Sequence, residues 1–102
     1  MSMNTQQIAK ALGDPIRFRI MQELAMEDGD CCPAERGDGR GLCNCELVAR
    51  LNMLQSRVSY HLRELIAAGL VLEEPRGKWH YYRLHRQTLG EYLAAVRDEF
   101  RL

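Results

Sequence analysis

The first half of the chain carries apolar residues that recur with the period of an α-helix. They lie one turn apart in two groups, Ile8 with Leu12 and then Ile16 with Ile20 and Leu24. Between the groups, Gly13 is typical of a helix end and Asp14-Pro15 is typical of a helix start. We therefore predict one helix over residues 4–12 and a second from residue 15 to about residue 26.

The second half shows helical patterns on either side of a segment with alternating apolar and polar residues. Helices are predicted at 43–51, 55–68 and 86–100, and strands at 70–74 and 79–84 around a turn at 75–78. Two short helices joined by a tight turn, the second of them polar and basic outward, are typical of a helix-turn-helix. The prediction is a mainly α fold with a small β-hairpin, a winged helix-turn-helix in the order α-α-α-α-β-β-α.

Length and composition place limits on this fold. We expect the 102 residues to form a single domain over residues 1–102, with a long cysteine-containing loop at 27–42. No apolar run approaches the roughly 20 residues that span a bilayer, and the N-terminal segment lacks the apolar stretch of a signal peptide. These features predict a cytoplasmic protein without membrane contact. The apolar stripe of the last helix predicts a homodimer formed through the first and last helices.

The charges are unevenly distributed although the net charge is zero. Acidic residues concentrate between residues 23 and 46, whereas residues 50–63 hold three arginines and no acid, and a basic stripe favours contact with nucleic-acid phosphates. A solvated helix face is the alternative interpretation. Side chains of the second helix of the motif are candidates for DNA contact: Gln55, Ser56, Arg57, Ser59, Tyr60, His61 and Arg63. His61 fits a structural role equally well, and Arg76 and Lys78 at the hairpin tip are candidates for phosphate contact.

The four cysteines occur as two pairs, Cys31-Cys32 and Cys43-x-Cys45. Without a secretion signal, such thiols indicate metal binding or redox chemistry more than structural disulfides. Within a helix, Cys43 and Cys45 would point about 200° apart, so they can share one ion only if Cys43 lies in or before the first turn. Amides at a helix N-terminus stabilise a thiolate, and thiolates select soft ions such as Cu(I), Zn(II), Cd(II), Pb(II) or As(III).

Several segments together resemble the ArsR/SmtB family of metal-responsive repressors. Residues 11–21 are similar to its early signature, 58–65 with 68–71 to its recognition helix, 77–84 to its wing, and 42–47 to the cysteine box of its arsenic, antimony, cadmium and lead sensors. The chain departs from many relatives at Leu54, where they have Ser or Thr, and at Val48, where some have a third cysteine. It has no histidine after His85, so the zinc and nickel site that relatives carry on the last helix is absent.

The resemblance implies a repressor that binds double-stranded operator DNA as a dimer and dissociates on binding As(III) or Sb(III). Cys43 and Cys45 are the expected ligands, completed by Cys31 or Cys32, with Cys32 preferred because it is nearer in sequence. The alternatives are a Cd(II) or Pb(II) sensor using all four thiols, with Zn(II) a further candidate ion, a thiol redox switch, and an adaptor protein that does not bind DNA. The absence of a Cys-x-x-Cys motif and of a thioredoxin-like pattern disfavours a thiol redox enzyme or switch. As a repressor, the protein is expected not to be an enzyme.

Overall fold

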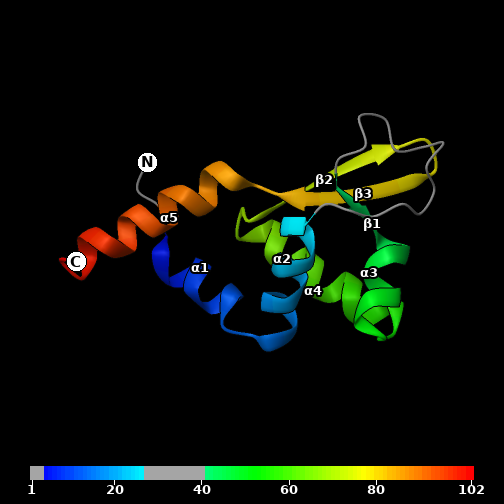
Figure 1. Cartoon of the computed structure of the whole chain (residues 1–102), viewed down its shortest axis with the longest axis horizontal. Helices are drawn as coiled ribbons and strands as arrows, with labels where there is room; N and C mark the ends of the chain where they lie inside the picture. Colours follow the sequence, from blue (N-terminus) through cyan, green and yellow to red (C-terminus); the bar gives the residue numbers. More distant parts are fainter. Residues whose placement is uncertain (1–3, 27–40) are drawn as a thin grey trace.

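The computed structural model describes residues 4–26 and 41–102. Within these residues the elements follow in this order: α1 (Thr5–Leu12), α2 (Pro15–Met26), β1 (Leu42–Cys43), α3 (Asn44–Leu51), α4 (Gln55–Ala67), β2 (Val71–Arg76), β3 (Trp79–Leu84) and α5 (Arg86–Glu99) (Figure 1). The arrangement is a winged helix-turn-helix, which confirms the predicted fold class. The strands β2 and β3 form the wing, and α3 with α4 form the helix-turn-helix.

Side-chain caps define where the first two helices begin. The side chain of Asn4 accepts a hydrogen bond from the Gln7 amide, and Asp14 Oδ1 accepts from the amides of Ile16 and Arg17 at 2.8 and 3.2 Å. Each cap satisfies amide groups that have no partner within the helix. The helix starts predicted near residues 4 and 15 are therefore confirmed.

The sheet differs from the predicted hairpin in two ways. It is antiparallel with the order β1-β3-β2, because Leu42 and Cys43 pair with Tyr82 and Tyr81. Leu42, which was expected in the loop, thus belongs to a strand. The strand β2 also continues through Pro75 to Arg76, two residues beyond the predicted end. Proline is tolerated there because β2 is an edge strand, which can lack one amide donor.

The core fills the space between the sheet and the helices α2, α3 and α4. Its fully buried side chains come from every one of these elements: Ile20, Leu24, Leu42, Leu47, Val58, Leu62, Leu65, Leu70, Val71 and Tyr81. The apolar sector predicted for α4 is confirmed by Val58, Leu62 and Leu65. The opposite side of α4 is left facing outward.

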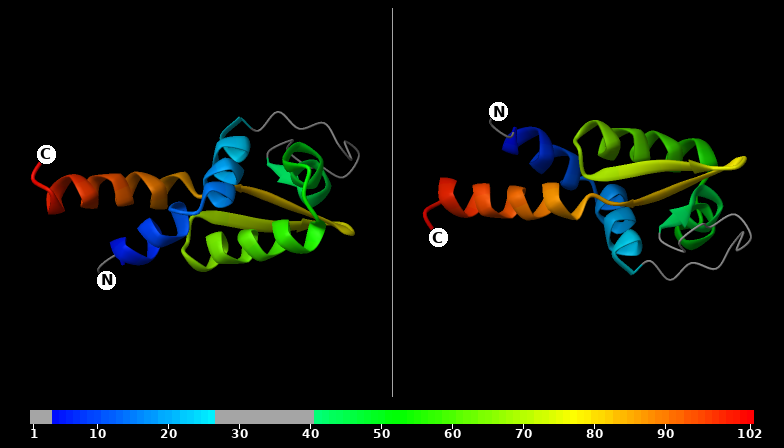
Figure 2. Two further views of the ribbon diagram at one scale, coloured as in Figure 1. Left: turned by 90° about the horizontal axis from the view of Figure 1, so that it is seen from below. Right: turned by 90° about the horizontal axis from the view of Figure 1, so that it is seen from above.

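The helices α1 and α5 lie side by side at the end of the molecule opposite the tip of the wing (Figures 1 and 2). The Thr5 hydroxyl donates to a Glu99 carboxylate oxygen at 2.8 Å and links the two helices. No residue of α5 is buried within the chain. Leu93 is 61% exposed and Phe100 is 70% exposed, so the apolar stripe of α5 is largely uncovered.

Candidate ion-binding and DNA-binding site

The cysteine pair lies where β1 ends and α3 begins. Cys43 is the N-cap of α3 with an extended backbone, φ −79° and ψ 164°, and Cys45 is the second residue of the helix. Because Cys43 is not part of the helix, the rotation of about 200° between helical residues two apart does not separate the two side chains. A site shared by both cysteines requires this. Their Cα atoms are 5.4 Å apart and their sulfur atoms are joined as a disulfide. Cys43 is buried and Cys45 is exposed.

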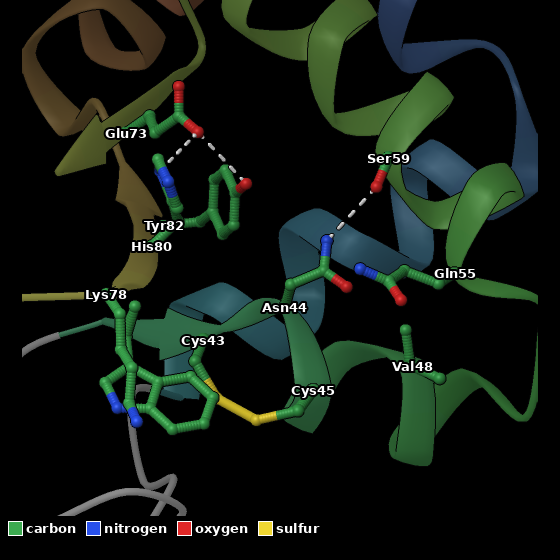
Figure 3. A pocket seen from close by; sticks show the side chains of 11 residues that line it. Cys43, Asn44, Cys45, Val48, Gln55, Ser59, Glu73, Lys78, His80 and Tyr82 are labelled. Atoms are coloured by element: carbon green, nitrogen blue, oxygen red, sulfur yellow. Dashed lines mark hydrogen bonds and ion pairs between the residues drawn. A yellow bond between two sulfur atoms is a disulfide. The ribbon is translucent and has the colours of Figure 1, made fainter. Parts of the chain in front are cut away.

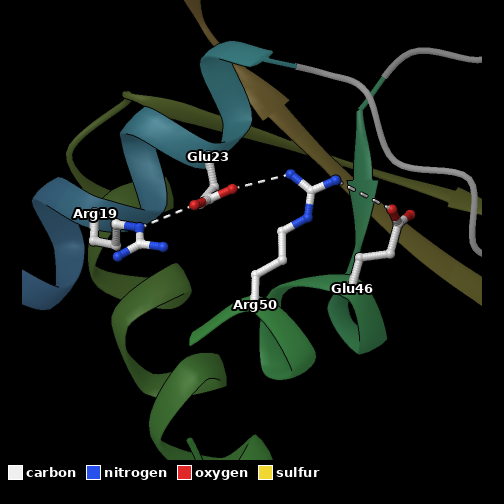
Figure 4. A network of polar contacts seen from close by, with 4 residues as sticks. All are labelled: Arg19, Glu23, Glu46 and Arg50. Carbon is white, nitrogen blue, oxygen red and sulfur yellow. Dashed lines mark hydrogen bonds and ion pairs between the residues drawn. The ribbon is translucent and has the colours of Figure 1, made fainter. Parts of the chain in front are cut away.

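A chain of charged side chains, of which Glu23 and Glu46 are buried, supports the first turn of α3 (Figure 4). The Cys43 sulfur lies 3.6 Å from Glu46 Oε1, a contact in which a thiol donates a hydrogen bond and a disulfide cannot. Arg50 connects Glu46 to Glu23 of α2, at 3.9 and 3.0 Å. Arg19 pairs with Glu23 at 2.9 Å. The hydrogen bond from Arg19, with further help from Arg50, lowers the pKa of Glu23 despite its burial.

The second cysteine pair, Cys31-Cys32, lies outside the described residues. Within residues 4–26 and 41–102, no group of three His, Cys, Asp or Glu side chains is arranged to hold a metal ion. A third sulfur ligand from Cys31 or Cys32 therefore stays a prediction, as does a site using all four thiols.

The cysteine pair opens onto a pocket of about 600 Å³ between the helix-turn-helix and the wing (Figure 3). Its walls come from three places: Cys43 to Cys45 with Val48, then Gln55 and Ser59 of α4, and then Glu73, Lys78, Trp79, His80 and Tyr82 of the wing. The pocket thus brings the cysteines, α4 and the wing to one cavity.

Most of the predicted DNA-contacting residues lie on the outward side of α4. The exposed side chains are those of Gln55, Ser56, Arg57, Tyr60 and Arg63. Ser59 is half-buried and accepts a hydrogen bond from the Asn44 side chain at 3.3 Å. The recognition helix begins at Gln55 with Leu54 as its N-cap, which provides no side-chain cap and is 72% exposed.

His61 does not lie with these residues. It is only 6% exposed, and its Nδ1 is 3.3 Å from a guanidinium nitrogen of Arg17. Because arginine only donates, the ring nitrogen must accept, so the ring is neutral. Burial lowers the pKa of His61, and the charge of Arg17 adds to this while Asp14 opposes it. His61 thus packs between α2 and α4, which fits the structural alternative, and a DNA contact by His61 stays a prediction.

The two wing cations have different surroundings. The Arg76 side chain is 11% exposed, pairs with Glu74, and its guanidinium lies 4.5 Å from the centre of the Tyr81 ring. Lys78, in the turn between the strands, is exposed. Arg76 thus braces the wing, and Lys78 is exposed at its tip. A phosphate contact by either residue stays a prediction.

Comparison with known proteins identifies the family. A profile described as "Bacterial regulatory protein, arsR family" matches residues 38–72. The "Arsenical resistance operon repressor" of Bacillus subtilis (strain 168) is 35% identical over 87% of this chain and 73% of that protein. The protein of the same name from Escherichia coli (strain K12) is 36% identical over 91% of this chain and 68% of its own length. The chain belongs to the ArsR family.

A solved ArsR-type structure extends this similarity to three dimensions. The "Crystal structure of Possible transcriptional regulator for arsenical resistance" superposes with a TM-score of 0.69 at 30% identity, covering 91% of this chain and 82% of that one. ArsR-family proteins are DNA-binding transcriptional regulators and not enzymes, as expected from the sequence. No helix within the described segments is long and apolar enough to cross a membrane.

Several residues of the site were not singled out from the sequence. Asn44, Glu46 and Glu23 carry the polar contacts around the cysteine pair, and Glu73 binds both His80 and Tyr82, each at 3.1 Å. Glu46 could have been noticed, because it lies three residues after Cys43 in the first turn of the helix. Glu23 and Glu73 belong to other elements, so the local pattern around the cysteines contains no signal for them.

Proposed function

We propose that this ArsR-family regulator is a homodimeric repressor that binds operator DNA and releases it when Cys43 and Cys45 capture As(III) or Sb(III). The observation that carries the proposal is the shared pocket, where the cysteine pair meets Gln55 and Ser59 of the recognition helix. The names of the Bacillus subtilis and Escherichia coli relatives support an arsenic-related inducer. A trivalent metalloid takes three sulfurs, and Cys32 or Cys31 is the proposed third ligand.

The uncovered stripe of α5 supports the dimeric part of the proposal. Leu89, Tyr92, Leu93, Val96 and Phe100 recur along one side of the helix, and none of them is buried within the chain. A second copy would cover this stripe together with α1. Two recognition helices would then face half-sites about 10 base pairs apart.

Release requires that the ion bind the DNA-free form more tightly than the DNA-bound form. Each tenfold difference in ion affinity contributes about 1.4 kcal/mol to the coupling between the two sites. The position of the cysteines supports such coupling, because they begin the first helix of the motif and adjoin the second.

The deciding experiment measures operator binding with and without arsenite. The duplex is one that the protein selects from a random-sequence pool, and the reductant is a phosphine, since thiol reductants compete for As(III). We expect specific binding that falls with rising salt and is lost on addition of arsenite. Equal affinity for the selected and a random duplex would contradict the repressor, and binding indifferent to arsenite and antimonite would contradict the inducer. Cd(II), Pb(II) and Zn(II) are titrated in parallel, and a response to Cd(II) or Pb(II) alone would favour that alternative.

Serine variants assign the ligands. Cys43→Ser and Cys45→Ser should bind the operator as the wild type does but fail to release it, because a hydroxyl is a poor ligand for soft ions. The Cys31→Ser/Cys32→Ser double variant should also lose tight As(III) binding, whereas either single variant can use the remaining neighbour. Normal release in both Cys43→Ser and Cys45→Ser would show that the pair is structural.

A thiol redox switch is a second candidate, favoured by the disulfide between Cys43 and Cys45. Hydrogen peroxide would be reduced to water as the two thiols lose two electrons and two protons and form the S–S bond. Oxidation would then remove both ion ligands. If peroxide releases the operator from wild-type protein but not from Cys45→Ser, while arsenite has no effect on either, the redox function is the correct one.

A further inference from the structure

Asn44 occupies an unusual position between the two cysteines. It is the first residue of α3, and peptide bonds join it to Cys43 on one side and to Cys45 on the other. Its side chain points away from the sulfur atoms and toward α4, where Nδ2 donates a hydrogen bond to Ser59 Oγ at 3.3 Å (Figure 3). The half-buried Ser59 is on the recognition helix, next to the exposed residues proposed to contact DNA.

The cysteine segment is also joined to the wing. Leu42, the residue before Cys43, pairs directly with Tyr82 of β3. Asn44 therefore lies in a segment whose backbone pairs with the wing and whose side chain bonds to α4.

We propose that Asn44 is the positioning residue that couples ion capture at Cys43 and Cys45 to the recognition helix. This inference rests on the proposed ion-sensing function. Metal–sulfur bonds set the spacing of the two sulfurs and so fix the backbone on both sides of Asn44. The side chain between them then turns, the bond to Ser59 is lost, and α4 leaves the position that binds DNA.

In this scheme, the bond to Ser59 is made in the DNA-binding arrangement and lost in the ion-bound one. A ligand shifts an equilibrium only through interactions that differ between the states. Asn44 touches neither the ion nor the DNA in this scheme, so removing its side chain should weaken the coupling while leaving both binding sites in place.

The test is a double-mutant cycle on the coupling between the ion and the DNA. Operator affinity is measured with and without arsenite for wild type, Asn44→Ala, Ser59→Ala and the double variant, in a phosphine reductant. We expect each single variant to reduce the ratio of the two affinities by roughly three- to tenfold, and the double variant to reduce it no further. Arsenite should bind the DNA-free variants at least as tightly as the wild type, because no bond between Asn44 and Ser59 has to be broken.

Ser56→Ala is the matched control, because it removes a serine hydroxyl three residues earlier on α4, at an exposed position, and leaves the bond between Asn44 and Ser59 in place. It should change operator affinity equally with and without arsenite, so that its ratio equals that of the wild type. Thermal unfolding checks each variant, and Ser59→Ala breaks the bond from the other side if Asn44→Ala does not fold.

Two results would overturn the inference. The first is a ratio of operator affinities without and with arsenite that is the same in Asn44→Ala and Ser59→Ala as in the wild type. This result would exclude the bond as the coupling element, and the sensor function would stand. Operator binding by the wild type that ignores arsenite would remove the sensor function, and the inference with it. Coupling is reciprocal. Within any one variant, the factor by which operator DNA weakens arsenite binding must therefore equal the factor by which arsenite weakens operator binding.

Discussion

At the residue scale, the identity of a side chain predicted which chemistry it can perform but not which residues surround it. The break in helical rotation that Cys43 and Cys45 need was foreseen, because it depends only on where α3 begins. His61 and Arg76 were grouped with the DNA-contacting residues by their place on the helix and the hairpin. The structure adds contacts of both residues within the chain. Arg17 is 44 residues from His61, so no local pattern could reveal that contact.

The two wing cations should therefore behave differently when removed. Lys78→Ala should weaken binding to selected and random duplexes alike and lower the slope of log affinity against log salt by about one unit, as loss of one phosphate contact does. Arg76→Ala should instead lower the unfolding temperature, because it removes the contacts with Glu74 and Tyr81. Salt titrations of DNA binding and thermal unfolding separate the two, and the reverse pattern would restore Arg76 as the phosphate ligand.

His61 should make folding stability depend on pH. Its pKa in the folded protein is lowered from 6.5 by burial, so the unfolded chain takes up the proton first as the pH falls. The stability contributed by the neutral ring is present above pH 6.5 and is lost as the pH falls toward the folded pKa. In urea unfolding at pH 7.5 and 5.5, His61→Gln should lose less stability on acidification than the wild type. An equal loss in both proteins would exclude His61 as the titrating group.

At the element scale, periodicity and caps predicted the helices closely, and contacts distant in sequence caused the errors. The strand β1 is two residues long, and its partners Tyr81 and Tyr82 lie about forty residues away, so no alternation marks it. The strand β2 passes through Pro75 because its edge position leaves that residue free of an obligatory amide bond. The helix α4 begins where expected even though Leu54 provides no side-chain cap.

Changing the caps should move stability in opposite directions at two helices. Asp14→Ala removes the acceptor for two amides of α2 and should cost about 1 kcal/mol of unfolding free energy. Leu54→Thr supplies an acceptor at the start of α4, where the leucine is mostly exposed, and should gain up to about 1 kcal/mol. Leu54→Ala is the control for the second change, since it removes the leucine without adding a cap. Chemical denaturation measures all three, and equal stability of the threonine and alanine variants would contradict the cap.

At the scale of the whole molecule, the fold follows from its elements but the assembly does not. The core between the sheet and α2, α3 and α4 accounts for most of the buried apolar residues, and the order of elements other than β1 was predicted without a partner. The helix α5 is different, because its period predicted an apolar stripe that the chain itself covers only in part. Leu89 and Tyr92 pack against the core, whereas Leu93 and Phe100 are exposed. A contiguous exposed apolar surface is typical of a protein–protein contact, but a single sequence does not name the second surface.

A charge placed on that stripe should separate the subunits. Leu93→Glu puts a carboxylate at a position 61% exposed in the single chain, where burial of the leucine side chain in a dimer would contribute roughly 2 kcal/mol per subunit. Gln87→Glu adds the same charge at an exposed position on another side of α5 and should leave the dimer intact. Sedimentation at several concentrations should find wild type and Gln87→Glu dimeric where Leu93→Glu is monomeric.

The monomer should also lose affinity for a two-half-site operator far more than for a single half-site, because its second recognition helix is no longer held in place. A wild type that is monomeric at every concentration, or a Leu93→Glu variant that stays dimeric, would exclude α5 as the interface.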